Sequence, residues 1–312
     1  MSTATLTDRD LLGELEPEAE RLLERHLAVA DEWFPHEYVP YSQGRDFDDR
    51  DPWTPDQPRL DGVARTAMYV NLLTEDNLPS YHREIHAMFG RRDTAWTTWV
   101  HRWTAEEGRH AIVLRDYLVV TRNEDPVKLE RGRMDAMQTG YDRDGRDVLH
   151  GMAYVSFQEL ATRISHRNTG RFSEDPVADR IMARVAAVEN LHMVFYRDLV
   201  QAALHVDPSA AVTAVADEVI GFAMPGAGIA GFGPASARIA DAGIYDPRNH
   251  LDEVIQPLLR KWGIFEVEGL DAAAARRRDE LAAFIDDLDQ TADRFVEKRE
   301  ARAARRARRA GA

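Results

Sequence analysis

Two copies of the motif Glu-x-x-His are the residues of this 312-residue chain best suited to metal chemistry. Glu107 and His110 form the first copy, and Glu189 and His192 form the second. A separation of three residues brings both side chains of a copy onto one face of an α-helix, where they can bind one ion together. A single copy would prove little, because such a pair is more often a surface pair or a core histidine with a protein partner.

Both copies fall within apolar helical stripes. Trp99, Trp103 and Leu114 share a face with the first copy at helical spacing, and Val185 and Leu199 share a face with the second. A carboxylate buried in such a stripe is costly unless a partner compensates for its lost hydration. Each copy therefore predicts a compensating partner, and a metal ion is the simplest one.

A single glutamate on its own apolar stripe precedes each copy of the motif. Glu107 follows Glu75 by 32 residues, and Glu189 follows Glu159 by 30 residues. Each separation fits a chain that runs down one helix, turns, and returns to the same level on an antiparallel neighbour. The sequence thus predicts a weak internal repeat that brings four carboxylates and two imidazoles together.

Four helices that contribute two single glutamates and two Glu-x-x-His pairs match the pattern of di-iron and di-manganese sites in ferritin-like bundles. Four carboxylates neutralise two divalent cations, which makes their burial tolerable. Mixed oxygen and imidazole ligands suit iron or manganese better than the usual four-coordinate zinc site. The chain contains no cysteine, so thiol catalysis and iron–sulfur ligation by its own residues are excluded. We expect two iron ions, with manganese as the alternative.

The hydrophobic periodicity predicts an all-α fold with a ferritin-like four-helix bundle and additional peripheral helices. The four strongest helical segments are 62–88, 94–121, 147–170 and 176–204, flanked by one or two short helices in 10–32, a helix over 247–262 and a last helix from about 270. Five prolines between Pro35 and Pro58 predict a long ordered loop, and glycines and prolines predict a break over 224–234. Pro79, four residues after Glu75, predicts either an ordinary kink or a local distortion at that carboxylate.

The length is consistent with a single helical domain over residues 1–295, with the core bundle at about 62–204. Basic residues accumulate after the apolar stripe ends at Phe295. Residues 296–312 are therefore predicted to form a solvated, mobile tail. A docking arm for an acidic partner is the alternative interpretation of this segment.

Charge and hydropathy exclude several classes of protein. A formal net charge of −14 argues against a general nucleic-acid or anionic-membrane surface. The acidic N-terminal segment is unlike a signal peptide, and the least polar run, 210–233, carries charges, proline and several glycines, so we expect no membrane insertion. These features predict a cytoplasmic protein.

The chain resembles the soluble acyl-acyl carrier protein desaturases, of the plastid stearoyl type and their actinobacterial relatives. The matching phrases span about 60–200 and are Leu73-Thr74-Glu75 followed by Leu78-Pro79, Trp103-Thr104-Ala105-Glu106-Glu107 with Arg109-His110, Ser156-Phe157-Gln158-Glu159 with Ala161-Thr162, Ile164-Ser165-His166, and Glu189 with His192. Weaker similarity continues at Trp33-Phe34-Pro35 and after residue 243.

The resemblance implies roles for particular residues. It implies that the iron ligands are Glu75, Glu107, His110, Glu159, Glu189 and His192, with Glu107 and Glu189 as the bridges. Thr162 matches the active-site threonine of the family, although a helical hydroxyl bonded to the preceding turn is an alternative. Met152 corresponds to a residue near the fatty-acyl tunnel, although a core methionine needs no such role.

One position departs from the plant members of that family. They have an acidic residue immediately before the second Glu-x-x-His, whereas Val188 stands here. A contact proposed to link a surface tryptophan, here Trp33, to the iron would then be lost. The departure leaves the six expected ligands unchanged but puts that electron route in doubt.

The implied reaction is the oxygen-dependent introduction of a cis double bond into a fatty acyl chain carried on acyl carrier protein. We find no flavin or iron–sulfur motif on the chain, so its electrons are expected from ferredoxin or a similar donor. The resemblance also implies a homodimer. Another ferritin-like di-iron oxidase or oxygenase, or a non-catalytic iron-binding bundle, is the alternative. Acyl chain length and double-bond position depend on tunnel depth and curvature, which the sequence leaves open.

Overall fold

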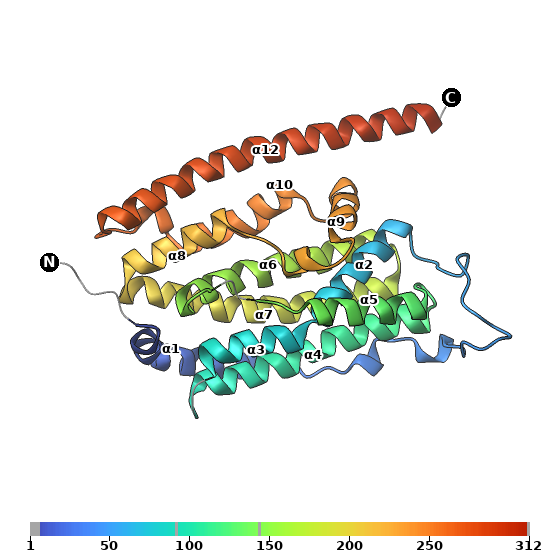
Figure 1. The fold of residues 1–312 in the computed structure, drawn as a ribbon, viewed down its shortest axis with the longest axis horizontal. Helices are drawn as coiled ribbons and strands as arrows, with labels where there is room; N and C mark the ends of the chain where they lie inside the picture. The colour runs from blue at the N-terminus through green and yellow to red at the C-terminus, as the bar shows by residue number, and fades with distance from the viewer. Residues whose placement is uncertain (1–6, 91–92, 143–144, 311–312) are drawn as a thin grey trace.

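A computed structural model describes residues 7–90, 93–142 and 145–310, and it confirms the all-α class, since these residues contain helices and no β-strand. Figure 1 shows long helices stacked side by side, with the C-terminal helix lying across one face of the stack. Residues 1–6, at the start of the predicted domain, and residues 311–312, at the end of the predicted tail, lie outside the described residues.

Four helices supply the core of the bundle. They are α2 (Gly62–Glu75), α4 (Ala95–Val120), α6 (Val148–Phe172) and α7 (Pro176–Val206). These helices agree with the predicted segments to within a few residues, except for α2. The apolar stripes expected from the sequence are buried between them, including Trp99, Trp103, Leu114, Val185 and Leu199.

The segment 62–88, predicted as one helix, is two helices. α2 ends at Glu75, and α3 (Leu78–Phe89) begins after a short turn. Pro79 occupies the first turn of α3, where its missing amide proton is tolerated, but it cannot donate to the carbonyl of Glu75. The distortion at Glu75 is therefore present, and it is a complete helix break.

The remaining helices cover the core. α1 (Asp8–Val29) is one helix that continues through Pro17, where the sequence predicted one or two short helices over 10–32. The others are α5 (Pro126–Thr139), α8 (Pro208–Ile220), η3 (Pro225–Gly228), α9 (Phe232–Asp241), α10 (Pro247–Asn249), the π-helical η4 (His250–Ile255), α11 (Gln256–Trp262) and η5 (Ile264–Glu266). The predicted break at 224–234 thus contains η3 and the start of α9.

Aspartates start the helices that carry the bundle. The carboxylate of Asp61 accepts from Val63 N at the start of α2, and Asp147 and Asp175 cap α6 and α7 in the same way. An acidic N-cap accepts hydrogen bonds from amide protons that have no partner within the helix. Its negative charge also interacts favourably with the positive end of the helix dipole. These caps mark where α2, α6 and α7 begin, whereas α4 begins after Thr94 without a side-chain cap.

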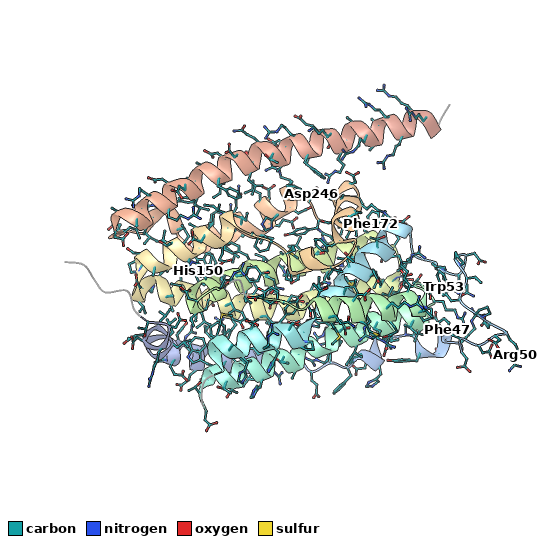
Figure 2. The ribbon with its side chains drawn as sticks, in the orientation of Figure 1. Phe47, Arg50, Trp53, His150, Phe172 and Asp246 are labelled. Carbon is teal, nitrogen blue, oxygen red and sulfur yellow. The ribbon has the colours of Figure 1, made fainter. Side chains whose placement is uncertain are left out.

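The proline-rich segment forms an ordered crossing, as the sequence predicted, and it contains η1 (Pro35–Glu37) and η2 (Tyr41–Gln43). Its outer part is held by the buried Arg122, which donates to the carbonyls of Asp46, Asp51 and Pro52. The Arg122 guanidinium also lies 4.2 Å from the ring centroid of Phe47. Figure 2 shows Phe47 and Trp53 at this end of the molecule. Arg122 thus fixes three backbone carbonyls in a segment that forms no long helix.

The last helix, α12 (Ala272–Ala310), continues through the basic segment that was predicted to be a mobile tail. The helix crosses residue 295, and the mobility of the basic segment stays a prediction. Basic residues of this part pair with carboxylates of the body: Arg299 with Asp246, and Arg302 with Asp241. Its outer residues are exposed. In Figure 1 this helix runs past α8, α10 and α9.

Across the described parts of the chain, no helix is both long enough and apolar enough to cross a bilayer.

Candidate metal centre

The structure brings the six predicted ligands together in the middle of the bundle. Glu75 comes from the end of α2 and Glu159 from α6, while each Glu-x-x-His pair projects from one helix, α4 or α7. We call these residues the six-residue cluster: Glu75, Glu107, His110, Glu159, Glu189 and His192. All six are at most 7% exposed, so the cluster is buried within the bundle.

The cluster divides into two groups that share two carboxylates. Ligand atoms of Glu75, Glu107, His110 and Glu189 lie within 4.8 Å of one another, and so do those of Glu107, Glu159, Glu189 and His192. Glu107 and Glu189 belong to both groups. A pair of ions bridged by two carboxylates requires this arrangement, although bridging itself stays a prediction.

The spacing of the side-chain atoms fits coordination of an ion. His110 Nδ1 lies 3.4 Å from Glu75 Oε2, 3.2 Å from Glu107 Oε2 and 3.3 Å from Glu189 Oε1. Atoms about 2.1 Å from a common ion stand about 3.0 Å apart in an octahedron and about 3.4 Å apart in a tetrahedron. One N–H could serve only one of these three oxygens well, whereas one ion would serve all of them.

Several atoms of the cluster are buried without a hydrogen-bond partner. They are Glu107 Oε1, His110 Nδ1, His110 Nε2, Glu159 Oε2 and His192 Nδ1. His192 Nδ1 lies 2.6 Å from Glu107 Oε1, but this contact lacks hydrogen-bond geometry. Buried polar atoms without partners are rare, and a bound ion is one of the explanations for them. The donor set therefore fits two divalent cations.

The electrostatics of the cluster point the same way. Burial raises the pKa of Glu159 well above its ordinary value, and the adjacent Glu189 carboxylate adds to the effect. Four carboxylates held this closely repel one another unless cations or protons neutralise them. Two divalent ions would do so without protonating any ligand.

Hydrogen bonds from outside the cluster fix the second histidine. His192 Nε2 lies 2.9 Å from Glu106 Oε2, which also contacts His26 Nε2 of α1 at 2.9 Å. Arg102 Nε donates to the other oxygen of Glu106 at 2.6 Å. Burial alone would raise the pKa of Glu106, but the hydrogen bonds from His192 and His26 hold this pKa well below its ordinary value. The N–H of His192 therefore points at Glu106, and its Nδ1 lone pair points at Glu107 and Glu159.

Two of the carboxylates are also oriented by neighbours. His166 Nε2 lies 2.9 Å from Glu75 Oε1, and Trp103 Nε1 donates to Glu159 Oε1 at 3.2 Å. Such contacts leave the second oxygen of each carboxylate free to face an ion.

The first histidine has no corresponding support. His110 Nε2 is buried without a partner, and the ring of Trp33 lies over it with centroids 6.3 Å apart. Trp33, expected at the surface, is 2% exposed and is covered by the guanidinium groups of Arg109 and Arg184. Val188 belongs to the same apolar cluster as Trp33 and offers no acceptor. The two halves of the centre therefore differ in how their histidines are held.

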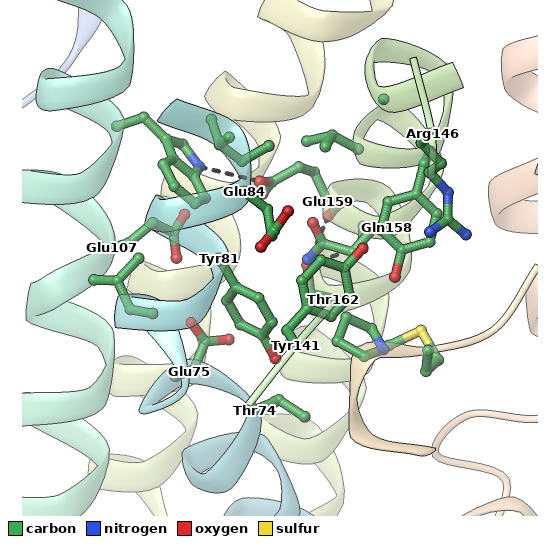
Figure 3. Close-up of a pocket in the computed structure, with 18 of the residues that line it drawn as sticks. Thr74, Glu75, Tyr81, Glu84, Glu107, Tyr141, Arg146, Gln158, Glu159 and Thr162 are labelled. Atoms are coloured by element: carbon green, nitrogen blue, oxygen red, sulfur yellow. Dashed lines mark hydrogen bonds between the residues drawn. The ribbon is translucent and has the colours of Figure 1, made fainter. Parts of the chain in front are cut away.

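A cavity leads to the cluster. It contains about 750 Å³ of space unoccupied by atoms, its open part included. Glu75, Glu107 and Glu159 line one part of it, and the walls are mainly apolar or aromatic, with Leu78, Tyr81, Ile85, Met88, Trp103, Tyr154, Val155 and Met224. Figure 3 shows the three carboxylates around this space. An apolar cavity that ends at charged groups suits a long apolar substrate.

Thr162 and Met152 differ in their relation to this cavity. Thr162 lines it, and its hydroxyl donates to the carbonyls of Gln158 and Glu159 at 3.1 and 3.0 Å. The back-bonded conformation considered from the sequence is thus present, and the catalytic role stays a prediction. Met152 is fully buried and is not among the lining residues, which include Gly151 and Val155 instead. Its tunnel role also stays a prediction.

Sequence reasoning missed three residues around the cluster: Glu106, His166 and His26. Glu106 and His166 lie within phrases that carry the family resemblance but received no role. His26 follows Leu22 and Leu23 on the buried face of α1, and a histidine on an apolar stripe was the only available signal.

Comparisons with known proteins agree with the geometry. A family model described as fatty acid desaturase matches residues 7–310. The chain is 49% identical to a Mycobacterium tuberculosis protein named acyl-acyl carrier protein desaturase DesA1, over 98% of this chain and 93% of that one. It is 33% identical to stearoyl-acyl carrier protein 9-desaturase 6 of Arabidopsis thaliana, over 75% of this chain and 63% of the relative. The X-ray structure of DesA2 from M. tuberculosis aligns with a TM-score of 0.69 at 31% identity, covering 82% of this chain and 95% of that one.

Proposed function

The chain belongs to the fatty acid desaturase family, and we propose that it desaturates a fatty acyl chain carried on acyl carrier protein, with dioxygen as oxidant. One observation carries the proposal: the largely apolar cavity is lined by three carboxylates of a buried cluster whose donor set fits two divalent cations. A storage or purely structural ion site would not need an apolar cavity beside it.

The reaction determines what the site must accomplish. Two C–H bonds on adjacent methylenes break and one C=C bond forms. Dioxygen is reduced to two waters with the two substrate hydrogens, two external electrons and two external protons. The chain carries no second redox group that we recognise, so the electrons come from a partner such as ferredoxin.

The six-residue cluster would hold two iron ions, with manganese as the substitute. When bound, these ions supply the activation of dioxygen that no side chain of this protein can provide. Glu107 and Glu189, shared by both halves, would bridge them. Glu106, His166 and Trp103 would keep His192, Glu75 and Glu159 oriented toward the ions.

The cavity provides positioning and water exclusion. Its walls would hold the acyl chain extended, with one pair of methylenes beside Glu75, Glu107 and Glu159. Correct placement of reacting atoms supplies a large part of a catalytic effect, and exclusion of water protects a strong oxidant from side reactions.

Thr162 is proposed to handle a proton at the rim of the cluster. Its hydroxyl donates to the backbone, so its oxygen keeps a lone pair that can accept a hydrogen bond from a group in the cavity. Rotation about the Cβ–Oγ1 bond would redirect the hydroxyl hydrogen from the backbone toward a group in the cavity.

A turnover assay distinguishes this function from its alternatives. The iron-loaded protein would be incubated with acyl carrier protein-bound fatty acids, reduced ferredoxin and oxygen, and the acyl products examined by mass spectrometry. We expect a product two mass units lighter that contains one double bond. Oxygen consumption without that product would indicate another di-iron oxidase, and iron binding without oxygen consumption would indicate a non-catalytic bundle.

The ligand assignment has its own test. Glu107→Ala removes a carboxylate that both halves share, so the iron content should fall by at least half while most of the helix content remains. Unchanged iron on metal analysis would contradict the assignment. Homodimer formation and a cytoplasmic location remain expectations from the family and the sequence, to be tested by light scattering and by fractionation.

A further inference from the structure

Three histidines pack together on the outside of the bundle, away from the six-residue cluster. His82 and His86 lie one turn apart on α3, and His101 faces them from α4. The ring centroids are 5.5 Å apart for His82 and His86, 6.3 Å for His82 and His101, and 5.9 Å for His86 and His101. His101 is exposed and the other two are partly exposed, so solvent can reach the trio.

We propose that His82, His86 and His101 form a second metal site, for a divalent transition ion of the zinc, copper or nickel class, which ties α3 to α4. Three imidazoles suit such ions better than calcium or magnesium, which prefer oxygen. Water would complete the coordination of the ion.

The separations of the rings are close to those that an ion requires. With a metal–nitrogen distance of about 2.05 Å, three imidazoles around a tetrahedral ion have their ring centroids about 5.2 Å apart. The observed separations exceed this value by roughly 0.3 to 1.1 Å. The trio is not among the groups whose ligand atoms converge within 4.8 Å, so binding requires the rings to turn toward one another. Side-chain rotation on a solvent-facing surface provides this movement.

The protonation of His82 already suits a ligand. The Thr104 hydroxyl donates to the Val100 carbonyl at 2.8 Å, so it must accept from His82 Nδ1, which lies 2.7 Å away. The proton of neutral His82 therefore stands on Nδ1, and Nε2 keeps its lone pair. Metal-binding histidines commonly donate their second ring N–H to such a partner. Burial and the two adjacent imidazoles also lower the pKa of His82, which favours the neutral ring.

The fold also constrains the position of His86. Its ring lies against the α-carbon of Gly90, the residue that ends α3, and a β-carbon at that position would stand 2.7 Å from the ring. Only glycine leaves room for the ring there. Two of the three imidazoles are thus positioned by contacts outside the trio.

The site would stabilise one wall of the substrate cavity. Tyr81, Ile85 and Met88 line the cavity from α3, and the two histidines occupy neighbouring positions on the same helix. An ion that joins α3 to α4 would limit the movement of this wall. The proposal itself needs only the trio and is independent of the desaturase function.

Zinc titration of the whole protein tests the proposal. The buried centre would first be filled with iron or manganese, loosely bound metal removed, and Zn²⁺ added with a chromophoric competitor at pH 7.5. We expect the protein to bind one additional equivalent of Zn²⁺ and to melt at a higher temperature when this Zn²⁺ is bound. Binding should be at least tenfold weaker at pH 5.5, where protons compete for the imidazoles.

Matched variants decide whether the trio is responsible. His101→Gln, which removes one of the three ligands, should weaken the binding of the additional Zn²⁺ at least tenfold. His205→Gln, at an exposed histidine near the end of α7, should leave it unchanged. Absence of the additional equivalent, or equal binding by His101→Gln and the wild type, would overturn the proposal. Circular dichroism of each variant confirms that a loss of zinc is not a loss of fold.

Discussion

Glu106→Gln offers a direct test of how the centre is held, because Glu106 touches only one of the two histidines in the six-residue cluster. Its Oε2 faces His192 and His26 at 2.9 Å each, and its Oε1 accepts from Arg102 at 2.6 Å. Glutamine keeps the size of the side chain and one acceptor oxygen. It removes the negative charge, and its NH₂ group would face groups that already donate hydrogen bonds to Glu106.

The expected magnitude follows from the role of Glu106. Loss of a group that orients a metal-bound histidine costs about 10- to 100-fold in metal affinity, or about 1.4 to 2.7 kcal/mol. Because Glu106 contacts His192 and has no hydrogen bond to His110, the weakening should affect one ion of the pair. The wild type supports His192 and leaves His110 Nε2 without a partner, so the variant should narrow or reverse the difference between the two binding steps.

The assay is an equilibrium titration of metal-free protein with Mn²⁺, or with Fe²⁺ under anaerobic conditions, followed by calorimetry. Glu124→Gln is the matched control, since Glu124 is also a buried glutamate but pairs with Lys128 away from the cluster. We expect two resolved steps in Glu106→Gln, with one step at least tenfold weaker, and wild-type titration in Glu124→Gln. Affinities within twofold of wild type at both steps of Glu106→Gln would refute the argument that this carboxylate positions His192.

Three further predictions concern stability. Gly170→Ala should destabilise the protein by about 1–3 kcal/mol in urea, because the new β-carbon would lie 2.8 Å from Met182 Cβ where α6 meets α7. Gly13→Ala, on α1 with no atom within 4 Å of the added carbon, should instead stabilise it by about 0.5–1 kcal/mol; equal effects of the two alanines would contradict this packing argument. Burial lowers the pKa of His250 to about 4, so the folded protein favours the neutral ring. The contribution of His250 to the free energy of unfolding is therefore complete above its unfolded pKa of about 6.5. That contribution is lost as the pH falls from about 6.5 toward 4, because the unfolded chain binds a proton that the folded protein does not. Removing His250 by the change to glutamine should flatten the dependence of unfolding free energy on pH in that window, and an unchanged slope would count against it. Chelation of the buried metal should lower the melting temperature while helical circular dichroism persists, and saturating Mn²⁺ at 100 times its Kd should restore about 2.7 kcal/mol; identical melting with and without chelator would contradict metal-linked stability.

Helical periodicity alone identified the six residues that meet in the centre. A carboxylate and an imidazole three residues apart must share a helical face wherever the helix goes, and two repeats of similar spacing imply antiparallel neighbours. The apolar stripes are equally local signals, which is why the four predicted helices agree with the observed ones except at the break after Glu75.

Contacts between distant segments were decided only by the tertiary structure. His26 and Glu106 are 80 residues apart, and His166 and Glu75 are 91 residues apart, so no local spacing reveals either pair. Trp33 could be read as a surface residue until the arginines of α4 and α7 were seen to cover it.

The sequence by itself determined the helical class and the donor set of the centre, because both follow from which residues share a helical face. The tertiary structure decided which nitrogen of each histidine faces the carboxylates, how unequally the two histidines are supported, and where the cavity reaches the cluster. It also brought His101 against His82 and His86. These features depend on the rotation and separation of whole helices, which the packing of the entire core sets and no single segment encodes.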